Sequence, residues 1–225
     1  MTLFRKAIKI SNSYLIYIPF LALSGLFIWT ESTHYYALLS AVLSFVLYPI
    51  VYGSIVEKLQ KVPQSSWNTL FARHIFNYLG LTLIFVVPIL ALNPLLSSLD
   101  SLTKSVVTAL IGMSIQCLAL YIWPSVFIKR RVFSSIYDGL VFLMQDLGKS
   151  WLMLLLIIIS TVVKFAAKSY AVSIIQNTNM TLIYSIGYLH NIIIGYIGLI
   201  IFSMATTLLV EDETTTTQVE PLKEI

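Results

Sequence analysis

Long runs of apolar residues alternate with short polar connectors along almost the whole chain. About 20 apolar residues are needed to cross the hydrocarbon core of a bilayer as a helix. Six runs reach or approach this length, near residues 14–30, 35–56, 75–97, 105–128, 151–173 and 182–210. Because a helix satisfies its backbone hydrogen bonds within its own segment, the pattern predicts an all-α fold: a polytopic transmembrane helical bundle with six spans.

The positively charged residues gather in alternate connectors. Those outside the apolar runs are Arg5, Lys6, Lys9, Lys58, Lys61, Arg73, Lys104, Lys129, Arg130, Arg131, Lys149 and Lys223. Only Lys104 among them falls in a connector of the other set. Short loops rich in Lys and Arg stay on the cytoplasmic side. We therefore expect a multi-pass protein of the cytoplasmic membrane, with both termini and the two long connectors in the cytoplasm.

Composition leaves little room for a water-soluble domain. Hydrophobic residues make up 58% of the chain and charged residues 11%, and the longest connector is 129–150. We expect one transmembrane helical domain over residues 1–210 and a disordered, acidic cytoplasmic tail over 211–225. The net charge of +4 needs no nucleic acid as partner, because topology and anionic headgroups explain the cations. The single Cys117 excludes an intramolecular disulfide and a Cys-rich metal site.

Both long connectors carry the pattern of an amphipathic helix. In the first, Ser65 or Ser66 can cap a helix that starts near Trp67. In the second, Ser134 or Ser135 is the expected cap. The expected apolar stripe of the second helix is Phe133, Ile136, Tyr137, Leu140, Met144 and Leu147. Each segment either lies in the headgroup plane with its apolar face down or simply extends the transmembrane helix that follows.

One stretch of the sequence resembles a known group of proteins. The stretch 123–156, WPSVFIKRRVFSSIYDGLVFLMQDLGKSWLMLLL, is similar to part of six-helix bacterial membrane proteins that include the YciC-like proteins and the membrane domain fused to glycerophosphoryl diester phosphodiesterases. In that group a proline-ended helix is followed by a short turn, an amphipathic helix and another span. The resemblance implies a role in the envelope or in lipid handling. The chemistry of the phosphodiesterase does not transfer, because this sequence has no counterpart of its catalytic domain.

Two lysines lie inside the fifth apolar run, where a charge is costly and marks a candidate functional site. Lys164 and Lys168 are four residues apart and share a helical face. Counting along antiparallel helices places His190 and Asn191 of the sixth run at a similar depth. These four residues predict a site for an anionic headgroup or organic anion, with Asn191 and Gln116 as walls of a cavity. In the alternative, both lysines snorkel to the outer headgroups and His190 bonds a neighbouring carbonyl.

Motifs that would indicate catalysis are missing. The sequence has no H-E-x-x-H, no G-x-S-x-G, no phosphate-binding glycine loop and no carboxylate cluster with metal-ligand spacing, so we expect no cofactor, metal or enzymatic activity. The preferred interpretation is a non-catalytic envelope, lipid-associated or assembly factor. Its expected partners are membrane lipids and a second copy or another membrane protein. The second interpretation is a small transporter or permease component for an anionic or lipid-like substrate, with a path between the fourth, fifth and sixth spans. The third is a membrane-rim enzyme that uses His74 with Asp138 or Asp146.

Overall fold

The computed structural model describes residues 2–24, 34–175 and 180–219, and their regular structure is helical throughout. One 3₁₀ turn, η1 (Leu15–Tyr17), accompanies the α-helices. These are α1 (Thr2–Asn12), α2 (Ile18–Ser24), α3 (His34–Leu59), α4 (Trp67–Leu96), α5 (Ser101–Leu118), α6 (Ile122–Lys129), α7 (Val132–Gln145), α8 (Leu147–Ile175) and α9 (Met180–Val219). The expected all-α fold is confirmed for the described residues.

Four of the described helices are long and apolar enough to cross a membrane. The crossing segments are Val42–Leu59 in α3, Trp67–Leu96 in α4, Leu147–Ala167 in α8 and Ser185–Thr214 in α9. A fifth is present if α5 and α6, which are bent by 42° at their junction, form one broken span. The first expected run, 14–30, extends beyond the described residues, and its described part is divided between η1 and α2. The described residues thus show four or five of the six expected spans.

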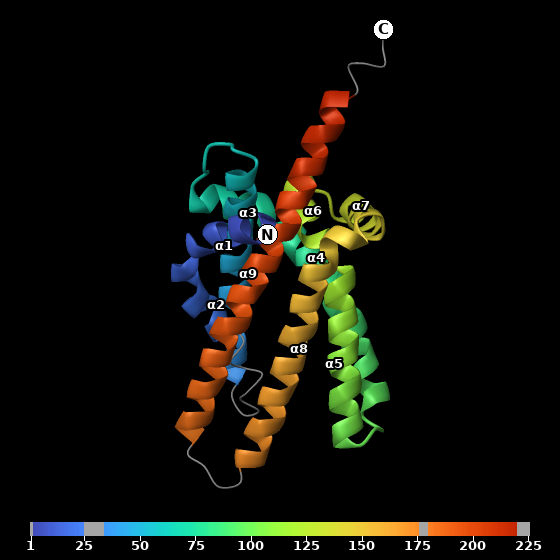
Figure 1. Cartoon of the computed structure of the whole chain (residues 1–225). Helices are drawn as coiled ribbons and strands as arrows, with labels where there is room; N and C mark the ends of the chain where they lie inside the picture. The colour runs from blue at the N-terminus through green and yellow to red at the C-terminus, as the bar shows by residue number, and fades with distance from the viewer. Residues whose placement is uncertain (1, 25–33, 176–179, 220–225) are drawn as a thin grey trace.

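The helices form an elongated bundle whose two long connectors lie toward the same end (Figure 1). The link between α3 and α4, the turn between α6 and α7 and the described ends of the chain all lie toward this end, which we call the connector end. The link between α4 and α5 lies at the opposite end (Figure 1). At the connector end, Lys6 Nζ lies 2.9 Å from Glu211 Oε1. This ion pair joins α1 to the last turns of α9.

The break between α5 and α6 follows from the position of Pro124. A proline has no backbone N–H, so Pro124 cannot donate to the carbonyl of Leu120, and its ring crowds that carbonyl. Pro124 therefore favours a break at residues 119–121, and a new helix starts with Pro124 in its first turn, where proline is tolerated. The break directs the side chains of Tyr121 and Phe127 into the bundle, where both are buried.

The buried core is concentrated toward the connector end. Fully buried side chains there include those of Ile55, Leu70, Leu81, Tyr121, Phe127, Met153, Leu199 and Met204. The remote parts of α4 and α5 instead expose apolar side chains such as Leu90, Leu95, Leu102 and Leu110. Although α4 and α5 are consecutive, they make little direct contact along the described residues. Lipid tails are as apolar as leucine, so a membrane can cover this exposed surface without cost.

The two long connectors differ from each other. In the first, Ser66 caps α4 by accepting a hydrogen bond from the Thr69 N–H at 3.4 Å, and the amphipathic segment is simply the start of α4. This outcome is one of the two alternatives stated above. The second connector forms a separate helix, α7, but the expected cap is wrong, because α7 begins at Val132 with Ser134 and Ser135 inside it.

α7 exposes part of the apolar stripe that was expected to face the membrane. Its buried residues are Ser135, Gly139, Phe142 and Leu143. Phe133, Tyr137 and Met144 of the predicted stripe are instead exposed. The small residues Ser135 and Gly139 lie one turn apart and let α7 approach the backbone of α6 closely: a Cβ built at Gly139 would lie 2.7 Å from Ile122 N. Ile136 and Leu140 of the stripe are half-buried against the cluster of Leu81, Ile122 and Val126. The exposed side chains of the stripe remain available to the bilayer.

The C-terminal helix is longer than its apolar run. α9 continues past residue 210 to Val219, through the first part of the segment that was expected to be disordered. The Thr214 hydroxyl donates to the Glu211 carbonyl at 2.8 Å within this extension. Residues 220–225 lie outside the described part of the chain.

Candidate functional site

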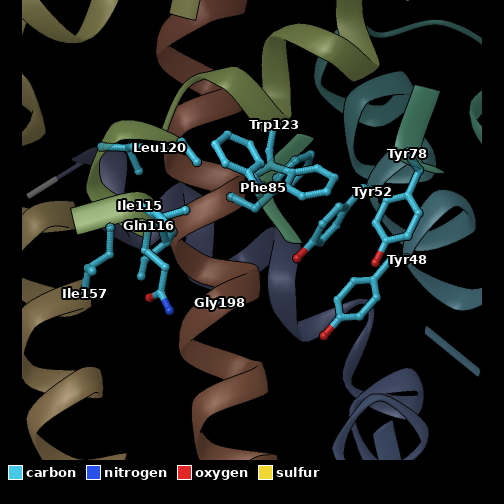
Figure 2. Close-up of a pocket in the computed structure, with 13 residues that line it drawn as sticks. Tyr48, Tyr52, Tyr78, Phe85, Ile115, Gln116, Leu120, Trp123, Ile157 and Gly198 are labelled. Atoms are coloured by element: carbon cyan, nitrogen blue, oxygen red, sulfur yellow. The ribbon is translucent and has the colours of Figure 1, made fainter. Parts of the chain in front are cut away.

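A cavity of about 390 Å³ lies inside the bundle between α3, α4, α5, α6, α8 and α9 (Figure 2). Ligand pockets commonly occupy about 300–1,000 Å³, so the cavity is large enough for a small ligand or part of a larger one. We call it the aromatic pocket. It is lined by Tyr48, Tyr52, Tyr78, Phe85, Ile115, Gln116, Ala119, Leu120, Trp123, Ile157, Gly198, Ile201 and Phe202.

Stacked aromatic rings form one wall of the pocket. Tyr48 and Tyr52 are one helical turn apart on α3 and present their rings on the same side (Figure 2). Tyr48 stacks on Tyr78 of α4 with ring centroids 5.9 Å apart, and Tyr78 lies 5.3 Å from Trp123 of α6. Tyr52 stacks on Phe202 of α9 at 4.0 Å. Such pairs contribute about 0.5–1.5 kcal/mol beyond their burial, so this wall ties four helices together.

The opposite wall is less crowded. It comes from the end of α5, from Ile157 of α8 and from Gly198 of α9. A Cβ built at Gly198 would meet no atom within 4 Å, so this glycine leaves open space beside the helix. The hydroxyls of Tyr48 and Tyr52 and the amide of Gln116 lie on the side of the pocket away from Trp123 (Figure 2). The pocket therefore has an apolar end under Trp123 and a weakly polar end.

The chemistry of the lining favours a neutral, largely apolar ligand. None of the residues lining the aromatic pocket is charged. It also holds no pair of titratable groups that could act as acid and base. Within the described ranges, no group of three His, Cys, Asp or Glu side chains is placed to hold a metal ion. The arrangement is suited to binding a hydrocarbon segment with one or two hydrogen-bonding groups near it.

The predicted anion site is brought together only in part. Lys164 on α8 is exposed, and its charge acts on the buried His190 of α9. Asn191 instead faces α2, because its Nδ2 donates to the Ala22 carbonyl at 3.3 Å. The Lys168 side chain lies outside the described part of the structure. Gln116 lines the aromatic pocket, as expected of a cavity wall, whereas Asn191 does not. That these residues bind an anion stays a prediction.

Sequence reasoning missed most of the aromatic pocket. The pairs Tyr48–Tyr52 and Tyr78–Phe85 are spaced four and seven residues apart, which puts each pair on one helical face. That spacing is a signal, but aromatic residues on one face are equally typical of ordinary helix packing. Gly198 gave no signal, because the open space beside it depends on how α9 lies against α5 and α8.

A buried ion pair fixes the connector between α3 and α4. Glu57 is 4% exposed, and its Oε1 accepts hydrogen bonds from Arg73 Nη1 and Ser65 Oγ, both at 2.7 Å. Its Oε2 accepts from the Ser65 backbone N–H at 2.8 Å. Both carboxylate oxygens are therefore engaged. Glu57 holds the end of α3, the loop and the start of α4 in one arrangement.

Comparison of the chain with protein-family models, with curated proteins and with solved structures finds no match. The described residues define a helical protein with four or five helices apolar and long enough for a membrane. The features of the described residues that bear on function are the aromatic pocket and the distribution of charges.

Proposed function

We propose that this chain is a non-catalytic, multi-pass protein of the cytoplasmic membrane that binds the hydrocarbon part of a lipid in the aromatic pocket. The observation that carries the proposal is the uncharged, mainly aromatic and aliphatic lining of that pocket. The pocket lies between Phe85 of α4 and Gln116 of α5, and these helices make little direct contact. A lipid chain can therefore enter from the bilayer without separating a tightly packed helix pair.

The charge distribution supports the proposed orientation. The connector end carries Lys58, Lys61, Lys129, Arg130 and Arg131, together with both described ends of the chain (Figure 1). We place this end in the cytoplasm, because positively charged short loops are retained there. The run 14–30, which is the first along the chain, supplies the remaining crossing of the proposed six. Its described part packs against α3 and α9. This layout is also that of the six-helix group which the sequence resembles.

A transport role is the second candidate. The aromatic pocket includes residues of α5, α8 and α9, the three helices between which a permease path was expected. Its neutral lining favours a lipid-like substrate over an anionic one. Quenching of a fluorescent lipid by dithionite in proteoliposomes distinguishes the two roles, because transport makes inner-leaflet lipid accessible faster than in empty vesicles, whereas binding alone does not.

The membrane-rim enzyme has little support. His74 is buried, with its ring 4.9 Å from the ring of Phe127. The two acids proposed to act with it have other partners, since Asp138 pairs with Lys129 at 2.9 Å and Asp146 with Lys149 at 2.8 Å. Nothing in this arrangement favours acid–base work by the three residues.

Filling the aromatic pocket should remove bound lipid. Gly198→Phe places a ring in the open space beside α9, and we expect the fraction of chains that retain a lipid to fall at least about tenfold, which corresponds to about 1.4 kcal/mol of binding free energy. The measurement is native mass spectrometry of protein released from lipid nanodiscs, with bound lipid counted per chain.

Gly112→Phe is the matched control. Gly112 also has no atom within 4 Å of a built Cβ, but it is not part of the pocket lining. The control should keep wild-type lipid occupancy. Equal occupancy in the two variants would show that lipid does not bind in the aromatic pocket.

A further inference from the structure

A second cavity, of about 280 Å³, lies where the segment after α1, the end of α3 and the start of α4 meet. We call it the Lys58 pocket. Its polar lining includes Ser13, Tyr17, Ser54, Lys58, Gln64 and Trp67. It shares no lining residue with the aromatic pocket, and it contrasts with that pocket in being polar and in containing a cation.

The Lys58 pocket carries a net positive charge. Lys58 Nζ donates to Ser13 Oγ at 2.8 Å and lies 5.7 Å from the ring centroid of Tyr14. No acid lines the cavity. The neighbouring Glu57 forms an ion pair with Arg73, so these two charges balance each other and Lys58 supplies the net charge of the pocket. A cation would meet repulsion in this cavity, whereas an anion would be attracted.

Hydroxyl groups surround the ammonium group. Tyr14 and Ser54 share a hydrogen bond between their hydroxyls at 3.0 Å, and each retains capacity for a further bond. Trp67 lies edge-on to Tyr17 with ring centroids 5.8 Å apart, which adds an aromatic wall at the start of α4. A phosphate group offers several strong acceptor oxygens, and lysine binds it as a point charge. The donors of this cavity match such a group.

The depth of Lys58 agrees with this chemistry. It belongs to the last turn of the crossing segment Val42–Leu59, which places it near the level of lipid phosphates. A lysine that only marked the cytoplasmic boundary would need no cavity beside it. Here the ammonium group is turned back over Tyr14 and held by Ser13, while the side chain stays accessible. We propose that the Lys58 pocket binds a phosphate group, carried by an anionic lipid headgroup or by a soluble phosphorylated molecule.

The test compares Lys58→Met with Lys61→Met. Both variants remove one positive charge from the same connector, but only Lys58 lines the cavity. In the lipid arm, the protein is reconstituted in phosphatidylcholine nanodiscs with increasing phosphatidic acid, and bound phosphatidic acid is counted by native mass spectrometry. In the soluble arm, glycerol phosphate is titrated into phosphatidylcholine nanodiscs and followed by tryptophan fluorescence.

We expect saturable binding of one phosphate group per chain in at least one arm, and the arm that responds identifies the source. Lys58→Met should weaken this binding at least tenfold, while Lys61→Met should change it less than twofold. Ser54→Ala, which keeps the charge, should weaken it severalfold and provides the test if Lys58→Met does not fold. In the soluble arm, Gly198→Phe should leave binding of glycerol phosphate unchanged, so the two pockets are tested separately. Absence of binding in both arms, or equal loss in the two lysine variants, would overturn the proposal.

Discussion

Replacing Glu57 by alanine is expected to lower the free energy of unfolding by about 3 kcal/mol. Removing one partner of a buried ion pair costs about 3–5 kcal/mol, because the other charge is left without compensation. The lower end of this range applies here, since the Arg73 side chain is 30% exposed and water screens the charge that is left unpaired. Ser65 loses two hydrogen bonds in the same variant.

Glu211→Ala provides the comparison for Glu57→Ala. Glu211 also forms an ion pair across the fold, with Lys6, but the two side chains are 59% and 50% exposed. Exposed pairs contribute about 0–1 kcal/mol, so this variant should unfold close to the wild type. Both are measured by denaturant unfolding in detergent micelles with circular dichroism. A Glu57→Ala loss no larger than that of Glu211→Ala would contradict the role given to the buried carboxylate.

Adding one methyl group at Gly139 is expected to destabilise the packing of α7 on α6 by about 2 kcal/mol. The new Cβ would lie 2.7 Å from Ile122 N and 2.8 Å from Ile122 Cα. These are backbone atoms, so a helix has to move, and overpacking of this kind costs about 1–3 kcal/mol. Thermal unfolding of Gly139→Ala in micelles measures the loss.

The same substitution at Gly148 should have the opposite sign. Gly148 lies in the first turn of α8, and a Cβ there meets nothing within 4 Å. Alanine is favoured over glycine in helices by up to about 1 kcal/mol, so Gly148→Ala should be neutral or stabilising. If both variants behaved alike, α7 would not be docked on α6 through Gly139.

The helical architecture could be predicted because long apolar runs leave a chain few other choices in a bilayer. Which face of α7 packs against α6 could not be predicted. The apolar stripe of α7 was expected to face the membrane, and Phe133 and Tyr137 of that stripe are exposed. The face that packs on α6 was not identified, because the small residues Ser135 and Gly139, which permit close helix contact, give no apolar signal in the sequence.

The candidate sites were likewise predictable from the sequence only in part. Counting residues along antiparallel helices predicts that Lys164 and His190 lie at a similar depth, because that relation depends only on helix rise and on two adjacent spans. The aromatic pocket depends on contacts between distant segments, such as Tyr52 with Phe202. The Lys58 pocket likewise depends on a contact between Lys58 and the distant Ser13. The spacing of residues within one helix does not reveal contacts of this kind.

The uneven distribution of buried residues makes the surrounding bilayer part of the protein's mechanics. The connector half is held by its own core, while the remote parts of α4 and α5 make little direct contact with each other. A membrane whose thickness does not match a helix imposes a cost of fractions of a kcal/mol per ångström, which tilting relieves. Thinning or thickening the bilayer should thus tilt α4 and α5 together relative to the connector half, because the short link 97–100 joins these two helices at their remote ends.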